Sequence, residues 1–224
     1  MKIPLTKYGL PQVVVLSAVI IAVMAVLFWA GRTQVAILAA ELILAIVLAF
    51  VLSFFRDPYR LPPADDKSLL APADGRIADI EIVEKKEFIR GKALRIGIFL
   101  SIFDVHINRS PCNVKVEKIT YKKGGFKDAR NTQASSFNES NDLFLTRKNE
   151  PFDKLIVRQI SGAIARRIVC KAKEGQELAG GEKFGMIKFG SRTELYMPAG
   201  EGVKCLVKVG DKVKAGLTPL IRYE

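Results

Sequence analysis

The sequence predicts a mainly β (α+β) fold, in which a barrel-sandwich-like β domain with few helices follows a two-helix transmembrane hairpin. Two long apolar runs near the N-terminus predict the hairpin, because a run of about 18 or more apolar residues can cross a bilayer. After a proline-rich stretch, the chain alternates short apolar and polar segments with Gly, Asp and Pro turns, which is typical of antiparallel β structure. With 224 residues, 49% of them hydrophobic, there is enough apolar material for a core besides the spans.

Residues 1–55 are expected to form the membrane hairpin, with spans at about residues 12–30 and 34–55. The connection between the spans is so short that the two helices must run antiparallel. The basic residues outside the spans are Lys2, Lys7, Arg56 and Arg60 at the two ends, and Arg32 in the connection. By the positive-inside rule, this excess puts both ends and the following domain on the cytoplasmic side of the cell membrane. A cleaved signal peptide is the alternative for the first span.

The formal net charge is +12; three basic residues and one acidic residue give residues 1–55 a charge of +2, so residues 56–224 carry +10. A basic domain next to a membrane is attracted to anionic lipid headgroups. The sequence holds no nucleic-acid motif, so we expect no nucleic-acid partner. Glu41, inside the second span, leaves two interpretations open, an ion or proton path or a carboxylate that faces the partner helix.

Residues 56–67, with three prolines, are expected to form a stiff linker, and residues 68–224 the second domain. Residues 122–141 are rich in Gly, Lys, Ser and Asn and predict a long loop that borders a substrate entrance. The turn chemistry of residues 71–75 returns between residues 197 and 216, as in lipoyl- and biotinyl-like barrel-sandwich domains. The expected strands lie at residues 77–83, 93–100, 113–120, 143–146, 155–157, 163–169, 186–189 and 193–197.

The Gly190–Ser191 peptide bond lies between the last two strand-like segments, and we expect a hairpin whose tight turn displays Ser191. The glycine leaves its carbonyl unshielded and permits left-handed backbone angles, which suits attack by the serine on the preceding bond. His106 is the only histidine, so any histidine-dependent chemistry must use it. The three cysteines are widely spaced and indicate reduced thiols rather than a metal site. They are Cys112, Cys170 and Cys205.

Five short motifs stand out along residues 56–224. They are Ala-Pro-Ala-Asp-Gly at 71–75, Phe-Asp-Val-His-Ile-Asn-Arg at 103–109, Asn-Glu-Ser-Asn at 138–141, Gly-Ala-Ile-Ala-Arg-Arg-Ile-Val at 162–169 and Phe-Gly-Ser-Arg at 189–192. In this order they closely resemble the phosphatidylserine decarboxylase family, and Phe-Gly-Ser-Arg resembles its short, archaeal-type branch. The ensemble is specific, although each motif alone is weak.

The resemblance implies a proenzyme that cuts its own chain between Gly190 and Ser191. Ser191 attacks the Gly190 carbonyl and becomes an N-terminal pyruvoyl group, with His106 as the base and Asp74 orienting that base. The pyruvoyl group forms an imine with phosphatidylserine and accepts the electrons released with CO2, which leaves phosphatidylethanolamine. His106 is also the expected proton donor in this step. Neither a metal nor pyridoxal phosphate is expected.

The same resemblance suggests how the substrate and the chains are held. The two chains, 1–190 and 191–224, are expected to stay associated, and a homo-oligomer is an open alternative. Lys188 and Arg192 flank the cleavage bond and are candidates to bind the lipid phosphate, although their alternation could equally send them to solvent. The membrane hairpin would bring the enzyme to a lipid that cannot readily leave the bilayer.

Three alternatives remain at this point. Archaetidylserine differs from phosphatidylserine outside the reacting headgroup, so the same mechanism could act on it. A membrane-tethered Ser-His-Asp hydrolase would use the same residue types, but the G-x-S-x-G elbow is absent. A lipoyl-like carrier would need an acceptor lysine at a hairpin tip, whereas Lys188 lies two residues before the Gly-Ser pair.

Overall fold

The computed structural model describes residues 4–31, 34–85, 87–128, 134–162, 167–188, 190–200 and 202–224. Lys2, Arg32, Phe189 and residues 163–166 of an expected strand lie outside the described residues. The chain divides into two compact units, Met1–Tyr59 and Arg60–Glu224.

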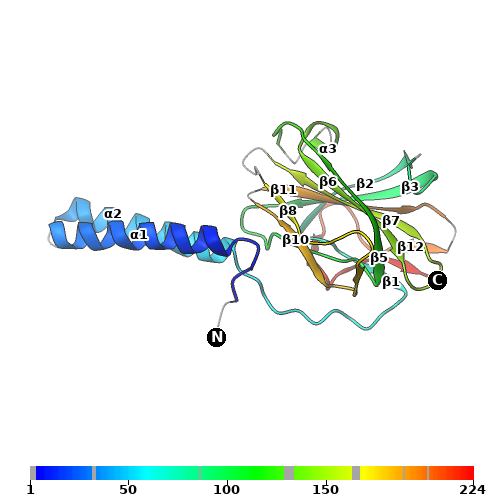
Figure 1. Cartoon of the computed structure of the whole chain (residues 1–224), viewed down its shortest axis with the longest axis horizontal. Helices are drawn as coiled ribbons and strands as arrows, with labels where there is room; N and C mark the ends of the chain where they lie inside the picture. The colour runs from blue at the N-terminus through cyan, green and yellow to red at the C-terminus, as the bar shows by residue number, and fades with distance from the viewer. Residues whose placement is uncertain are drawn as a thin grey trace. The chain divides into compact units, whose positions relative to one another are not determined.

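The first unit is a pair of antiparallel helices, α1 (Leu10–Ala30) and α2 (Val35–Phe54), which lie side by side (Figure 1). Both are long and apolar enough to cross a membrane, with mean hydropathies of 2.9 and 3.0, as the sequence predicts. Only Val13 of α1 and Phe54 of α2 are buried, unlike the side chains of a core helix in a soluble protein. Thr6 N donates to Phe55 O at 2.9 Å, so the two ends of the hairpin lie together.

Glu41 lies in α2 and lines an apolar hollow of about 380 Å³ in the hairpin. Met24 and Phe28, both on α1, line the same hollow. This position favours the interpretation in which the carboxylate faces the partner helix.

The second unit is mainly β, and its described residues contain one short helix, α3 (Ala134–Phe137). Its strands are β1 (Ser68–Leu70), β2 (Gly75–Lys85), β3 (Gly91–Leu100), β4 (Ile107–Arg109), β5 (Val114–Lys122), β6 (Ser140–Arg147), β7 (Lys154–Ser161), β8 (Ile168–Cys170), β9 (Glu177–Leu178), β10 (Lys183–Ile187), β11 (Ser191–Pro198), β12 (Val203–Cys205), β13 (Lys212–Val213) and β14 (Pro219–Tyr223).

These strands form three antiparallel sheets. An eight-stranded sheet, in the order β13-β2-β3-β11-β7-β6-β5-β9, curls around the core (Figure 1). Two three-stranded sheets, β1-β14-β12 and β4-β10-β8, complete the unit. The predicted mainly β fold with few helices is confirmed.

The core explains why the start of β11 is buried. Ile98 and Leu100 of β3 are fully buried in the apolar core, and their register partners on β11 are Thr193 and Ser191. Leu195 continues the same face of β11 into the core, because strand side chains on one face recur every second residue. The face that is apolar further along β11 therefore carries two hydroxyls at its start.

The predicted Gly-Ser hairpin is wrong. β10 pairs with β4 and β8, whereas β11 pairs with β3 and β7, so the chain passes from one sheet to another at this point. Ser191 is the first residue of β11 and is fully buried rather than displayed at a turn. Alternating residues on both sides predict two strands, but they do not determine which sheets the strands join.

The two stretches with similar turn chemistry pack against each other. β13 pairs with the start of β2, and Gly216 N donates to Ala71 O at 2.9 Å. Ala215 N donates to Asp74 Oδ1 at 2.8 Å. The C-terminal part of the chain thus holds the turn at Asp74.

The predicted loop at residues 122–141 is partly taken up by strands, since β5 extends to Lys122 and β6 begins at Ser140. Asn138 attaches its described part to the sheet. Asn138 Nδ2 donates to Lys127 O and to Ser161 O, each at 2.7 Å. The loop is therefore anchored at the end of β7, where β7 meets the start of β11.

Candidate active site

Ser191 begins β11 in the interior of the eight-stranded sheet, between β3 and β7. Its side chain is fully buried, and its Oγ has no hydrogen-bond partner among the described residues. Such a hydroxyl is costly, because it gives up its bonds to water without replacing them. Gly190, directly before it, has the left-handed conformation expected from the sequence, with φ +58°. The predicted nucleophile is thus shielded from water beside the bond that it is predicted to attack.

Ser161, the last residue of β7, is the cross-strand partner of Ser191. Directly opposed residues of an antiparallel pair share a face, with Cβ atoms about 4.5–5.5 Å apart. Ser161 is also fully buried, and its Oγ also has no hydrogen-bond partner in the described part of the chain. No sequence pattern predicted a site role for Ser161. It stands directly before the motif that begins at Gly162, but only the strand register brings it opposite Ser191.

His106 is fully buried just before β4. Its Nδ1 lies 2.9 Å from the backbone oxygen of Asp104. Since a carbonyl oxygen can only accept, Nδ1 carries the proton of this bond, and in the neutral ring Nε2 is then the basic nitrogen. Ile187 N donates to His106 O at 3.2 Å, which ties the histidine to the end of β10.

A chain of buried side chains connects β4 to β11. Asn108 Nδ2 donates to Thr193 Oγ1 at 3.0 Å, and Gln159 Nε2 donates to Asn108 Oδ1 at 2.9 Å. Asn141 Nδ2 donates to Gln159 Oε1 at 3.0 Å. A hydrogen-bonded network of this kind makes a core more rigid. It therefore fixes β4, which follows His106, relative to β11, which begins with Ser191. Asn108 and Asn141 lie within the recognised motifs, but spacing alone gave them no role.

The carboxylate of Asp74 is bonded to groups other than its predicted partner, His106. Arg60 donates to both of its oxygens, from Nη1 at 2.5 Å and Nη2 at 2.7 Å, and both side chains are largely buried. Together with the bond from Ala215 N, this fixes the turn at 71–75. Pro72 O, in the same turn, accepts from Arg109 N at 3.0 Å. The turn that Asp74 anchors is therefore bonded to β4, the strand that follows His106.

Lys188 lies directly after β10 and is 7% exposed. Its backbone N donates to Arg167 O at 3.3 Å. Burial, followed by the positive charge of Arg167, lowers the pKa of the Lys188 amine. A cation that is held partly out of water favours an anionic partner, so this position remains compatible with the predicted phosphate role.

Arg192 is fully buried on the opposite face of β11 from Ser191. Its Nη2 donates to both carboxylate oxygens of Asp79, and its Nε donates to Glu194. A guanidinium that is already shared between two carboxylates, away from solvent, is poorly placed to receive a lipid phosphate. The structure therefore disfavours the phosphate role predicted for Arg192.

Comparison with known proteins identifies the family of this chain. The family described as phosphatidylserine decarboxylase matches residues 47–220. The chain belongs to the phosphatidylserine decarboxylase family. A phosphatidylserine decarboxylase proenzyme of Desulfotalea psychrophila is 44% identical over 178 residues, covering 80% of this chain and 81% of the relative. The proenzyme of that name from Carboxydothermus hydrogenoformans is 41% identical over 226 residues, covering 100% of both chains. Assignment to the short, archaeal-type branch stays a prediction.

An open hollow of about 510 Å³ lies near the ends of the strands described above. Glu139 and Arg167 are among the residues that line it. The backbone of Glu139 is bonded to Ser161, and the backbone of Arg167 is bonded to Lys188. Ser161 and Lys188 are thus each bonded through the backbone to a residue that lines the hollow. Its other lining residues are Tyr121, Lys123, Gly124, Phe126 and Ile168.

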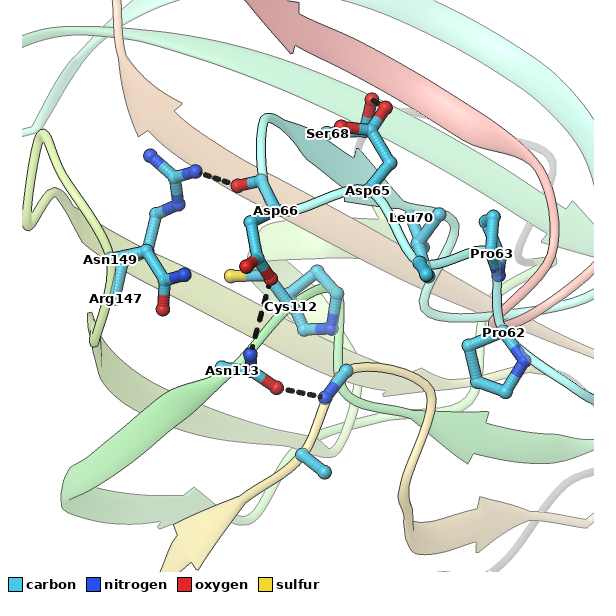
Figure 2. A pocket seen from close by; sticks show the side chains of 14 residues that line it. Pro62, Pro63, Asp65, Asp66, Ser68, Leu70, Cys112, Asn113, Arg147 and Asn149 are labelled. Carbon is cyan, nitrogen blue, oxygen red and sulfur yellow. Dashed lines mark hydrogen bonds between the residues drawn. The ribbon is translucent and has the colours of Figure 1, made fainter.

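A smaller hollow, of about 190 Å³, lies under residues 62–66 (Figure 2). Figure 2 shows Arg147 pointing to the backbone oxygen of Asp66, and Asn113 between Asp66 and the chain at Gly180. These bonds join the start of the second unit to its sheets. None of the predicted site residues lines this hollow, and the hydrogen bonds around it have a structural role.

Proposed function

We propose that this chain is a membrane-associated, self-processing decarboxylase, a carboxy-lyase that releases CO2 from phosphatidylserine and leaves phosphatidylethanolamine. Membership of the family supports the reaction class. One observation carries the self-processing: the left-handed Gly190 directly precedes the buried Ser191, whose Oγ has no partner among the described residues. An ordinary core serine would satisfy its hydroxyl, so an unsatisfied one beside a left-handed glycine fits a bond that is meant to react.

In the proposed cleavage, Ser191 Oγ adds to the carbonyl carbon of Gly190 and gives its proton to His106 Nε2. The C–N bond breaks, the amine takes up a proton, and an ester joins the two residues. Loss of the Cα proton of residue 191 and breakage of its Cβ–O bond release chain 1–190 with a carboxylate end. Hydrolysis of the remaining enamine, with loss of ammonia, leaves a pyruvoyl group at the start of chain 191–224.

The pyruvoyl group supplies a carbonyl electron sink for decarboxylation, a task for which other enzymes use pyridoxal phosphate. The residues around position 191 fit such a group, because the buried Ser161 hydroxyl faces it with free hydrogen-bonding capacity among the described residues. His106 would return a proton to the substrate carbon, since imidazole exchanges protons near neutral pH. Lys188, whose backbone is bonded to Arg167 in the lining of the hollow of 510 Å³, would bind the lipid phosphate.

Asp74 would act on His106 indirectly. Its carboxylate is bonded to Arg60 and to Ala215 N, and the turn that it anchors holds β4 through Pro72 O. We therefore include it as a positioning residue that orients His106 through this turn.

The two apolar helices would anchor the enzyme in the cell membrane with the β unit on the cytoplasmic side. Cys205 is exposed, whereas Cys112 is buried and burial raises its thiol pKa to about 12. A membrane-impermeant maleimide should therefore label Cys205 in lysed cells and not in intact cells. Labelling of Cys205 in intact cells would refute the cytoplasmic orientation.

The decisive experiment compares wild-type protein with Ser191→Ala. Wild-type protein should run as two chains on a denaturing gel, the smaller with a blocked N-terminus by intact mass, and should release CO2 from phosphatidylserine vesicles. Ser191→Ala should remain one chain and be inactive. Ser68→Ala, which removes another buried hydroxyl, should behave as wild type. A wild-type protein that is active as a single intact chain would refute the proposal, and a parallel assay with archaetidylserine identifies the preferred lipid.

A further inference from the structure

The two faces of β11 differ directly after the proposed cleavage bond. Ser191 and Thr193 point to the core, and Arg192 and Glu194 point to the opposite face, because strand side chains alternate. Arg192 and Glu194 are nevertheless fully buried. Burying charges is costly, so this arrangement needs partners and a reason.

Both charges have partners. Arg192 Nη2 donates to the two oxygens of Asp79 at 2.6 and 2.8 Å, and Nε donates to Glu194 Oε1 at 2.8 Å. Glu194 Oε2 accepts from Tyr196 Oη at 2.5 Å and from Ser135 Oγ at 2.8 Å. Burial by itself would raise the pKa of Glu194, but Arg192 and these hydrogen bonds outweigh burial and lower it, so the pair is ionised.

Two local features of the neighbouring strands make room for the pair. β2 has a bulge after Ile77, so that Ile77 pairs with Ile98 in the core while Asp79 pairs with Gly97. Without the extra residue, Asp79 would face the core as Ile77 does. A Cβ at Gly97 would lie 2.0 Å from Arg192 Nη2, so the glycine leaves the space that the guanidinium fills.

The proposed cleavage separates these partners into two chains. Asp79 belongs to chain 1–190, whereas Arg192 and Glu194 belong to chain 191–224. After the cut, residue 191 is a chain end that has lost its backbone N–H, and chain ends fray unless they are tied down. Continued alignment of residue 191 with Ser161 then depends on the next residues of β11.

We propose that Arg192 is a positioning residue whose buried ion pair with Asp79 holds the start of β11 in register across the cut. The inference rests on the proposed function and deepens it. The ion pair is an inter-chain contact made by the residue next to the reactive end, on the face away from the substrate. Its loss should therefore slow the chemical step without weakening lipid binding.

Asp79→Asn tests this role, with Asp142→Asn as the matched control. Asp142 forms a comparable ion pair with Arg158 in the same sheet, and the carboxylate side chains are 13% and 12% exposed at positions 142 and 79. For Asp79→Asn we expect self-cleavage and kcat to fall by about tenfold with KM changed by less than about twofold. Asp142→Asn should change neither by more than about twofold. Arg192→Lys should recover part of the loss seen in Arg192→Gln.

Hydrogen exchange provides a readout that does not depend on activity. In processed wild-type protein, the amides of Thr193 and Glu194 should be as protected as in uncleaved Ser191→Ala, and in processed Asp79→Asn they should lose protection. The proposal is overturned if Asp79→Asn matches Asp142→Asn, if its defect lies in KM alone, or if cleavage deprotects these amides in wild type. Should Asp79→Asn fail to fold, the wild-type comparison still decides. A wild-type chain that never cleaves would instead refute the proposed function.

Discussion

The two faces of β11 separate reactivity from support. On the core face, Ser191 is neutral, buried and without a hydrogen-bond partner among the described residues. On the opposite face, Arg192 and Glu194 are charged, equally buried and bonded to side chains of β2, α3 and β11 itself. A hydroxyl can remain unsatisfied only if its backbone cannot move to find a partner, and the ion pairs one residue away restrict that backbone. The difference teaches that one strand can fix its position through charged contacts on one face and keep an unsatisfied hydroxyl on the other.

Loss of the base on the reactive face should have the largest effect. In His106→Asn the amide Nδ2 takes the place of Nδ1 and can still donate to Asp104 O, so the fold should be kept while the basic Nε2 is lost. We expect self-cleavage to slow by about 10²- to 10⁴-fold. The measurement is the time course of chain separation on a denaturing gel, with a melting curve to verify folding. Cleavage at the wild-type rate would reject His106 as the base.

Crowding the supporting face should have the next largest effect. Gly97→Ala puts a Cβ against the Arg192 guanidinium, and overpacking of this kind typically costs about 1–3 kcal/mol. Denaturant unfolding should show this loss, together with slower self-cleavage. Gly200→Ala is the control, because an added Cβ there meets nothing within 4 Å. Equal stability of the two variants would show that the guanidinium does not fill this space.

Removing the second hydroxyl on the reactive face should reduce the rate and leave the fold intact. For Ser161→Ala we expect kcat to fall by about tenfold and the free energy of unfolding to stay the same or rise, since an unsatisfied buried hydroxyl is lost. Ser110→Ala should do the reverse. It breaks a bond from Ser110 Oγ to Cys112 O and should cost about 1 kcal/mol without a change in rate. An unchanged kcat in Ser161→Ala would limit this residue to packing.

The smallest expected effect is a change in how stability depends on pH. In wild type the pKa of Glu194 lies below its ordinary 4.5, so the unfolded chain binds more protons, and this contribution is lost as pH falls below 4.5. In Arg192→Gln, burial is no longer opposed by the guanidinium and should raise this pKa. The folded chain then binds more protons, and the contribution should grow as pH falls towards 4.5. Unfolding titrations should therefore show the stability of wild type relative to Arg192→Gln decreasing as pH falls towards and below 4.5; parallel curves would contradict the coupling.

Local patterns were enough to predict most of the fold. Uncharged runs predicted α1 and α2 to within a few residues, because length and hydropathy are properties of a single segment. Alternation predicted β2, β3, β5, β6 and β7, although most of these strands extend beyond the expected ends. The prediction of a hairpin at Gly190 was wrong, because strand pairing depends on contacts between segments that are distant in the chain.

The candidate site shows the same division. Composition singled out His106, and the motifs singled out Asp74 and Ser191, but Ser161 gave no signal until its register with β11 was known. Arg192 was predicted to face a phosphate or solvent, since alternation gives two faces without saying what covers each. The bulge after Ile77 decided this by turning Asp79 towards Arg192.

The sequence by itself determined the two long apolar helices, the mainly β class, the family motifs and the left-handed glycine before a serine. These depend on local composition, chain geometry and the order of short segments. Only the tertiary structure decided that this serine is buried in a sheet interior rather than exposed on a turn, and that a buried ion pair lies on the other face of the strand. Strand register and burial arise from contacts between residues that are distant in the chain, and those contacts are absent from any single stretch of sequence.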